Sequence, residues 1–508
     1  MQLGYFTRLN VVIYFVLFSF FFLFLNSWDS YLYDTSHSGI DPTWFFMCGR
    51  AWMNGLTPYV DFADCKGPLL WLIYGVGSLL HPHSFVGVFW ISVAFFAVLF
   101  YFIHHTALLM VDDQRWAMIC VLPLAFLLFL PIVHDEVRAE DFCNTFLMVS
   151  LYITCRLLYG PTLPEGARWS HGFALGACFG ALVMIKYNVA AACSVFILFS
   201  WLYQYGQCKR RLWVLLLWQL AGLAAVVLPF VIYLHSVGAL DDFVQCYFLD
   251  AFTTVGDHTP FWLIHPVESI IIIVTTFLCS LLPLFWLKKW KWMPVVVYAF
   301  LLLSILKGGY VYYLQTVTLA YLFGLISAAW YLKNRRGVVV SHAVVMLSVV
   351  AWPLLTFVSG DRGCLLLKKE SELSQGYYQT QYVMSQVPHG KMIFWGFRNT
   401  PLMMCTTVLP GCRYWAEQNM PTEAMLADQR MAVLQDKADF VVVRKARKDL
   451  NRILQRKGYH AYDLMGDDAA FYHSRVVLYS QRELKLPPKD FRVSKMDLLL
   501  KRDLFETD

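Results

Sequence analysis

Long apolar runs separated by short basic clusters dominate this chain. Each run approaches or exceeds the roughly 20 residues that a helix needs to cross the hydrocarbon core of a bilayer. The runs lie at Val11–Leu25, Val86–Met110, Trp116–Val133, Phe142–Leu158, Gly172–Tyr205, Leu212–Leu234, Ile264–Leu287, Trp292–Leu332 and Val338–Val358. This pattern predicts an α-helical polytopic membrane protein.

Two of these runs are longer than one crossing, and a lysine interrupts each. Basic clusters flank both runs: Arg168 and Lys209–Arg211 around the first, and Lys288–Lys291 and Lys333–Arg336 around the second. Basic loops favour the cytoplasmic side of a membrane. We therefore expect each run to cross twice, with Lys186-Tyr187-Asn188 and Lys307-Gly308-Gly309 as outward-facing turns.

The short apolar run Leu69–Leu80, ended by His81, decides the remaining topology. As a full crossing it would place every later basic cluster outside, so we expect a helix lying on the outer surface. The chain then crosses about eleven times, with its N-terminus inside and its C-terminus outside. The loops that meet on the outer face are Asn26–Leu69, His134–Asp141, the Lys186 turn, His235–His265 and the Lys307 turn.

Composition agrees with a membrane protein. Of the 508 residues, 58% are hydrophobic and 15% are charged, whereas in soluble domains about a quarter of all residues are charged. The net charge of +6 is modest, and the lysines and arginines between the apolar runs lie in short loops, so we expect the lipid bilayer and no nucleic acid as a partner. The first apolar run lacks a small-x-small cleavage site, which favours an uncleaved first helix over a signal peptide.

Most of the 13 cysteines lie inside apolar runs and have no spacing suited to zinc. Cys364, Cys405 and Cys412 are the exceptions, and a disulfide among these three stays an open alternative.

After Val358 the sequence becomes polar and its periodicity changes. Strand-like runs (Met392–Trp395, Phe440–Val443 and Arg475–Tyr479) alternate with helix-like runs (Glu423–Leu434 and Arg447–Gln455). We therefore expect a membrane domain at 1–358 and a small extracytoplasmic α/β domain at 359–508.

The first outer loop, residues 26–69, is rich in aspartate. Asp41 starts an amphipathic run with a proline just inside, where an aspartate also serves as a helix cap. Lys66 precedes Gly67-Pro68 where the loop returns to the membrane surface. Its amine either lies at the interface as an anchor or points at a lipid phosphate.

The second outer loop reads HDEVRAED and holds Arg138 and Glu140. Glu140 and Asp141 stand at the start of a helix, where carboxylates also favour the helix dipole. His134, Asp135 and Glu136 resemble metal ligands, but adjacent residues rarely point at one ion. We expect no cofactor, with a divalent metal as the alternative.

Lys186 and Lys307 interrupt apolar helices, where a charge is costly unless it is paired or solvated. Both lysines are therefore functional candidates, although each could simply mark a turn. Tyr310, Tyr312 and Tyr313 follow Lys307, and an aromatic belt accounts for tyrosines there. Gln315 has no such explanation.

The sequence around these residues resembles that of lipid-donor glycosyltransferases of the GT-C fold. The first outer loop is similar to that of a bacterial branch of these enzymes. The enzymes of this branch are similar to dolichyl-phosphate-mannose-protein mannosyltransferases and include aminoarabinose and lipopolysaccharide-core sugar transferases. That branch has an acidic residue at the start of this helix, a G-x-x-P-Y-x-D turn and a K-P/G-P-L motif. Here these fall on Asp41, on Gly55 through Asp61, and on Lys66 through Leu69. The resemblance continues through Glu140, Lys186 and the YYLQ segment that ends at Gln315.

The resemblance implies transfer of a sugar from a polyprenyl-phosphate donor to a hydroxyl of an extracytoplasmic glycan, lipid or protein, at the outer face of the cell (inner) membrane. A phosphate leaving group needs positive charge, for which Lys66 and Arg138 come first and Lys186 and Lys307 second. The acceptor hydroxyl needs a base, for which Asp41 comes before Glu140. The remaining expected substrate-binding residues are Tyr59, Asp61, Tyr313 and Gln315.

Two other functions stay open. A transporter or flippase of lipid-linked glycans would have charges along its helix centres and pseudo-symmetric halves, whereas here the charges gather on one side. A non-catalytic factor in glycan assembly is the second alternative.

Overall fold

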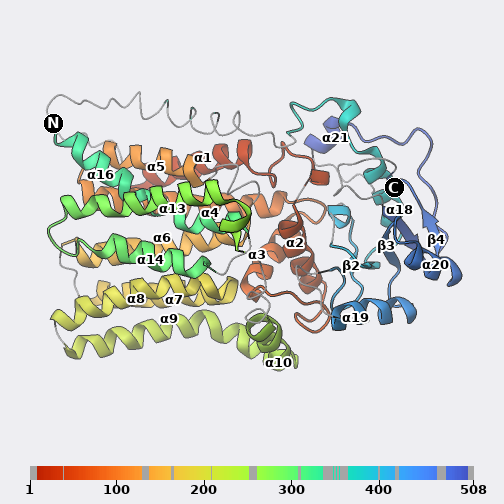
Figure 1. The fold of residues 1–508 in the computed structure, drawn as a ribbon, viewed down its shortest axis with the longest axis horizontal. Helices are drawn as coiled ribbons and strands as arrows, with labels where there is room; N and C mark the ends of the chain where they lie inside the picture. The colour runs from red at the N-terminus through yellow and green to blue at the C-terminus, as the bar shows by residue number, and fades with distance from the viewer. Residues whose placement is uncertain are drawn as a thin grey trace. The chain divides into compact units, whose positions relative to one another are not determined.

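In the computed structural model (Figure 1), the described residues are 8–37, 39–128, 137–161, 165–207, 209–250, 260–306, 310–335, 364–398, 401–404, 406–417, 423–465 and 476–500, with residues 347, 351 and 354. They form two compact units: Met1–Asn26, Ser92–Tyr233 and Phe252–Gly360 make the first, and Ser27–Ile91, Leu234–Ala251 and Asp361–Asp508 the second. The predicted run Val338–Val358 lies almost entirely outside the described residues. The domain boundary at residue 358 stays a prediction.

The first unit is a bundle of apolar helices. Its long helices are α1 (Arg8–Asn26), α4 (Val86–Val111), α5 (Gln114–Leu128), α6 (Ala139–Leu158), α7 (Glu165–Ile185), α8 (Tyr187–Gln207), α9 (Lys209–Ser236), α13 (Pro266–Leu281), α14 (Met293–Ile305) and α16 (Tyr321–Lys333). The short ones are α12 (Phe261–Ile264), the 3-10 turns Leu282–Phe285 and Val311–Tyr313, and α15 (Leu314–Thr318). Helix α6 packs on α7 and α8, and α8 packs on α14.

Among the described residues, six helices are long and apolar enough to cross a membrane, and Gln114–Leu128, Trp169–Ile185 and Met293–Ile305 are shorter apolar helices of the same unit. This confirms the predicted class, a multi-pass α-helical protein. The count of about eleven crossings stays a prediction.

Both predicted interruptions coincide with helix ends. Helix α7 ends at Ile185 and α8 begins at Tyr187, so Lys186 alone lies between them. Helix α14 ends at Ile305 and the next helical turn begins at Val311, but Lys307 itself lies outside the described residues.

In the second unit, the first outer loop and the short apolar run after it form two helices that touch closely. They are α2 (Ile40–Met53) and α3 (Pro68–Leu80). A Cβ added at Gly49 would lie 2.4 Å from the main-chain nitrogen of Gly75, so these glycines permit the contact. With 13 residues, α3 is about 20 Å long, too short to cross the roughly 30 Å hydrocarbon core. Its place on the membrane surface stays a prediction.

A five-stranded mixed sheet forms the rest of this unit, in the order β2-β1-β3-β5-β4. The strands are β1 (Lys391–Phe394), β2 (Leu409–Pro410), β3 (Phe440–Arg444), β4 (His460–Tyr462) and β5 (Val476–Ser480). Strand β1 is parallel to β2 and β3, while β5 is antiparallel to β3 and β4. The three predicted strands are thereby confirmed.

Two predicted helices cover one face of this sheet. Helix α19 (Glu423–Leu434) and helix α20 (Lys448–Arg456) pack Val433 and Leu454 against alternate strand residues such as Val441 and Val443. The remaining elements of the unit are the turn Thr35–His37, α10 (Leu240–Phe243), the π-helix Val244–Asp250, the turns Glu370–Glu372 and Pro401–Met403, α18 (Gln375–Ser385) and α21 (Lys495–Leu499).

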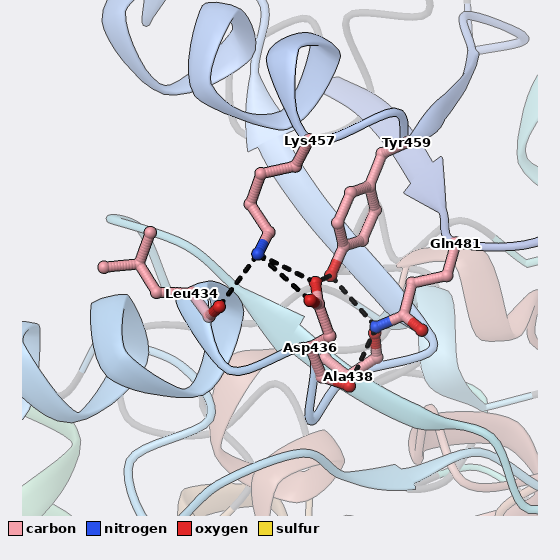
Figure 2. Close-up of polar contacts among 6 residues, drawn as sticks. All are labelled: Leu434, Asp436, Ala438, Lys457, Tyr459 and Gln481. Carbon is pink, nitrogen blue, oxygen red and sulfur yellow. Dashed lines mark hydrogen bonds and ion pairs between the residues drawn. The ribbon is translucent and has the colours of Figure 1, made fainter.

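Polar contacts hold the end of α19 (Figure 2). The Lys457 amine donates to the carbonyl of Leu434 at 2.8 Å and is 3.0 Å from the carboxylate of Asp436. The Tyr459 hydroxyl donates to Asp436 at 3.2 Å, and the Gln481 amide donates to the carbonyl of Asp436 at 2.9 Å. A basic side chain at a helix C-terminus satisfies carbonyls that the helix leaves open.

Candidate functional site

A cluster of charged and polar side chains surrounds the start of α6 in the first unit. The main-chain N–H of Arg138 donates to the Asp141 carboxylate at 2.8 Å, which caps the helix start. The other oxygen of that carboxylate accepts from the Gln315 amide at 2.5 Å. Asp141 therefore ties the start of α6 to α15.

Glu140 forms a buried ion pair with Lys186. The two side chains come from α6 and from the break between α7 and α8, and Glu140 and Lys186 are only 2% and 8% exposed. Burying two charges costs several kcal/mol per ion unless each finds a partner, so the pair explains how a lysine is tolerated at this break.

Two consecutive tyrosines lie against the two cations. The guanidinium carbon of Arg138 is 4.0 Å from the ring centre of Tyr312, and the amine of Lys186 is 3.8 Å from that of Tyr313. Such contacts stabilise a cation by about 0.5–2 kcal/mol without neutralising it. The cluster thus holds two positive groups, and the Glu140 carboxylate pairs with one of them, Lys186.

The structure brings together five of the residues that the sequence singled out: Arg138, Glu140, Lys186, Tyr313 and Gln315. It adds Asp141 and Tyr312, which stand next to predicted residues in HDEVRAED and YYLQ. Nothing in the sequence distinguished Tyr312 from its neighbours, because its role depends on the approach of Arg138. Lys307 and the three residues His134–Glu136 lie outside the described residues.

The turn of the first outer loop has a clear local geometry. Gly55 and Tyr59 both adopt positive φ, 86° and 67°, a conformation that glycine takes readily and a bulky residue seldom does. The Tyr59 hydroxyl donates to the carbonyl of Lys66 at 2.8 Å, and the Asp61 carboxylate accepts the N–H of Thr57 at 2.6 Å. These contacts make Tyr59 and Asp61 supports of the turn, and the structure does not test their predicted contact with substrate.

Asp41 and Lys66 lie in the second unit. Asp41 is the second residue of α2, in the first turn, and Gly39 is the N-cap, so the alternative that Asp41 caps this helix is wrong. The Lys66 amine is 5.6 Å from the ring centre of Phe45 on α2. This geometry does not test the predicted role of either side chain.

Among the described residues, no three His, Cys, Asp or Glu side chains are grouped as metal ligands. Cys364 and Cys412 have free thiols. Cys405, the third cysteine of the suggested disulfide, lies outside the described residues.

The fold is similar to that of known GT-C enzymes. ArnT from Cupriavidus metallidurans, in a crystal structure bound to undecaprenyl phosphate, superposes with a TM-score of 0.63 at 12% identity, over 95% of this chain and 99% of ArnT. The apo structure of ArnT gives a TM-score of 0.58 at 12% identity, over 93% of this chain and 97% of ArnT. No protein-family model and no curated protein sequence matches this chain.

The class of protein follows from this likeness. The chain has the GT-C fold, as its first outer loop and its apolar helices predicted.

Proposed function

We propose that this protein is a membrane glycosyltransferase that moves a sugar from a polyprenyl-phosphate donor to a hydroxyl of an extracytoplasmic acceptor. The observation that carries the proposal is the pair of cations, Arg138 and Lys186, held on Tyr312 and Tyr313 beside Glu140. A fold shared with a protein that binds undecaprenyl phosphate supports the same donor chemistry.

The chemistry requires little more than charge and a base. The acceptor oxygen forms a bond to the anomeric carbon of the sugar while the bond from that carbon to the phosphate oxygen breaks. A phosphomonoester has a second pKa near 6, so the polyprenyl phosphate leaves without a proton donor. Fixed positive groups stabilise the charge that develops on it. A carboxylate takes the proton of the acceptor hydroxyl.

We assign these roles as follows. Arg138 and Lys186 bind the donor phosphate, together with Lys66 and Lys307. Asp41 is the base, with Glu140 as the second choice because Lys186 already engages its carboxylate. Tyr59, Asp61, Tyr313 and Gln315 shape the substrate site. The membrane is the cell (inner) membrane, and the site and the C-terminal α/β domain face outward.

The first test replaces Arg138. The Arg138→Met variant keeps an apolar stem and loses the charge, so kcat/KM for a polyprenyl-phosphate sugar should fall by about 10²–10³-fold. Transfer is measured with purified protein in lipid nanodiscs, at equal amounts of folded protein.

Tyr312 supplies the matched control. Tyr312→Phe keeps the ring face that holds Arg138 and should retain most activity, whereas Tyr312→Leu should lose part of it. If Arg138→Met has the kcat/KM of the wild type, Arg138 does not bind the donor. If the wild-type protein transfers sugar from none of several polyprenyl-phosphate sugars, the proposed function is contradicted.

A further inference from the structure

The second unit contains a hollow of about 710 Å³. None of the residues that line this hollow belongs to the cluster around α6. The turn of the first outer loop, the edge strand β2 and helix α19 line it. The N–H of Ala63 donates to the carbonyl of Arg413 at 3.0 Å, which joins the loop to the strand side of the hollow. Small-molecule sites typically have about 300–1,000 Å³, so one or two sugar rings fit.

The acidic groups of this hollow are already engaged by its walls. Asp61 accepts the N–H of Thr57 at 2.6 Å, and Asp428 accepts the N–H of Tyr414 at 3.0 Å. Burial, with Asp428 nearby, raises the pKa of the Cys412 thiol, so this side chain is neutral at physiological pH. Each carboxylate thus has part of its charge compensated by a main-chain donor.

The basic groups differ in this respect. Arg413 donates to Asp242 at 2.6 Å and to the sulfur of Cys246 at 3.0 Å. Lys391 and Lys437, both exposed, have no hydrogen bond or ion pair through their amines to any described residue. The hollow therefore presents two ammonium groups that are available to an anion.

Apolar side chains complete the lining. Val60 is 39% exposed and Met431 is 49% exposed, and Leu56 and Pro410 lie with them along the hollow. The C–H face of a sugar ring packs well on such side chains, while a simple inorganic anion gains nothing from them.

We propose that this hollow binds an anionic saccharide, a sugar that carries a carboxylate or a phosphate. Lys391 and Lys437 bind the charged group, and Val60 and Met431 pack on the ring. Identifying that saccharide as a part of the acceptor rests on the proposed glycosyltransferase function. Binding of the saccharide in the hollow does not depend on that function.

The test measures binding to the full-length protein in nanodiscs by saturation-transfer NMR. The probes are galacturonate, galactose 6-phosphate, neutral galactose and inorganic phosphate. We expect one or both anionic sugars to bind at least about tenfold more tightly than galactose and than phosphate alone, since hydrogen bonds to charged groups are the stronger ones. The tighter of the two identifies a carboxylate or a phosphate as the preferred group.

The Lys391→Met/Lys437→Met variant should lose this preference and keep the affinity for galactose. The control, Lys448→Met/Lys485→Met, removes the same charge from two exposed lysines that do not line the hollow, and it should bind as the wild type does. Equal binding of galactose and the anionic sugars, equal binding of phosphate alone, or an unchanged Lys391→Met/Lys437→Met variant would each overturn the proposal.

Donor turnover, measured separately, distinguishes this failure from failure of the proposed function. Anionic sugars that bind to a protein unable to use any polyprenyl-phosphate sugar would leave the hollow as a saccharide site and refute the transferase. Turnover of the donor without binding of the probes would refute the hollow alone.

Discussion

Lys186 contacts a carboxylate and an aromatic face at the same time, and the two contacts have different consequences. Glu140 neutralises the amine, whereas the ring of Tyr313 stabilises it and leaves its charge in place. A structural ion pair needs only the first contact. A lysine that binds a donor phosphate benefits from both, because the ring holds the amine while the phosphate competes with Glu140.

Replacing one or both partners separates stability from function. Lys186→Met leaves the Glu140 carboxylate buried and unpaired, which should lower the free energy of unfolding by about 3–5 kcal/mol. The double variant Lys186→Met/Glu140→Gln has no buried charge, so most of that stability should return while transfer stays lost. Thermal unfolding in nanodiscs and kcat/KM give the two readings. A double variant that is both stable and active would leave the pair with a structural role only.

The position of Asp41 fits two roles, a catalytic base and a carboxylate that stabilises the start of α2 through the helix dipole. An acidic residue in the first helical turn stabilises a helix by about 0.3–1 kcal/mol, so Asp41→Asn should lower stability only slightly. As the base, it should contribute about 10²–10⁴-fold to turnover. We expect kcat to fall within that range.

The control for Asp41 is Asp490→Asn, which removes an exposed carboxylate from the C-terminal part of the same unit. Its kcat should equal that of the wild type. Retention of more than about a tenth of kcat by Asp41→Asn would return that residue to its role at the helix start.

At the scale of elements, close contacts between helices are the features that the apolar pattern could not reveal. Helices α7 and α9 touch at glycines: a Cβ at Gly222 would lie 2.0 Å from the carbonyl oxygen of Phe173, and one at Gly176 would lie 1.9 Å from that of Gln219. Small residues at helix contacts are typical of membrane proteins, because close packing replaces the hydrophobic driving force there.

A methyl group at this contact should separate the helices. Gly222→Ala places a Cβ against main-chain atoms that cannot rotate away, and we expect a loss of about 1–3 kcal/mol. Gly206→Ala is the control, since a Cβ at Gly206, near the end of α8, meets nothing within 4 Å. Thermal unfolding of both variants checks this, and equal stability of the two would show that α7 and α9 adjust without cost.

The elements differ in how well local sequence predicted them. Helix α19 and strands β1, β3 and β5 were expected within one or two residues of their bounds, because each strand is a short apolar run and α19 is a longer run of helix-favouring residues. Strands β2 and β4 have only 2 and 3 residues, too few for any period to appear. The π-helix Val244–Asp250 was not predicted, because the pattern of apolar residues does not reveal the extra residue in each of its turns.

At the scale of the whole molecule, the orientation of the helices in the membrane is the prediction with the widest consequence. Single cysteines introduced next to Lys186 and Lys307 should react with a membrane-impermeant thiol reagent added from outside. Cysteines next to Lys289 and Arg335 should react only after the membrane is made permeable. Labelling at Arg335 from outside would refute the topology and place the basic clusters on the wrong side.

The sequence alone determined the class of this protein. Apolar runs of bilayer length, basic clusters between them and a polar C-terminal segment with alternating strands and helices are local properties, since each depends on side chains a few residues apart. The same holds for the lysine between α7 and α8, because a charge inside an apolar run is costly unless it is paired or solvated. Arg138 and Glu140 stood out in the polar loop HDEVRAED, Lys186 by its place inside an apolar run, and Gln315 in the segment YYLQ.

Only the tertiary structure decided which of these residues meet. The pairing of Glu140 with Lys186, the support of Arg138 by Tyr312 and the hydrogen bond from Gln315 to Asp141 join segments up to 174 residues apart. Their geometry follows from how α6, α8 and α15 pack, and packing depends on the shapes of many side chains at once. The hollow lined by Lys391 and Lys437 has the same origin, because the loop and the sheet edge that form its walls are distant in sequence.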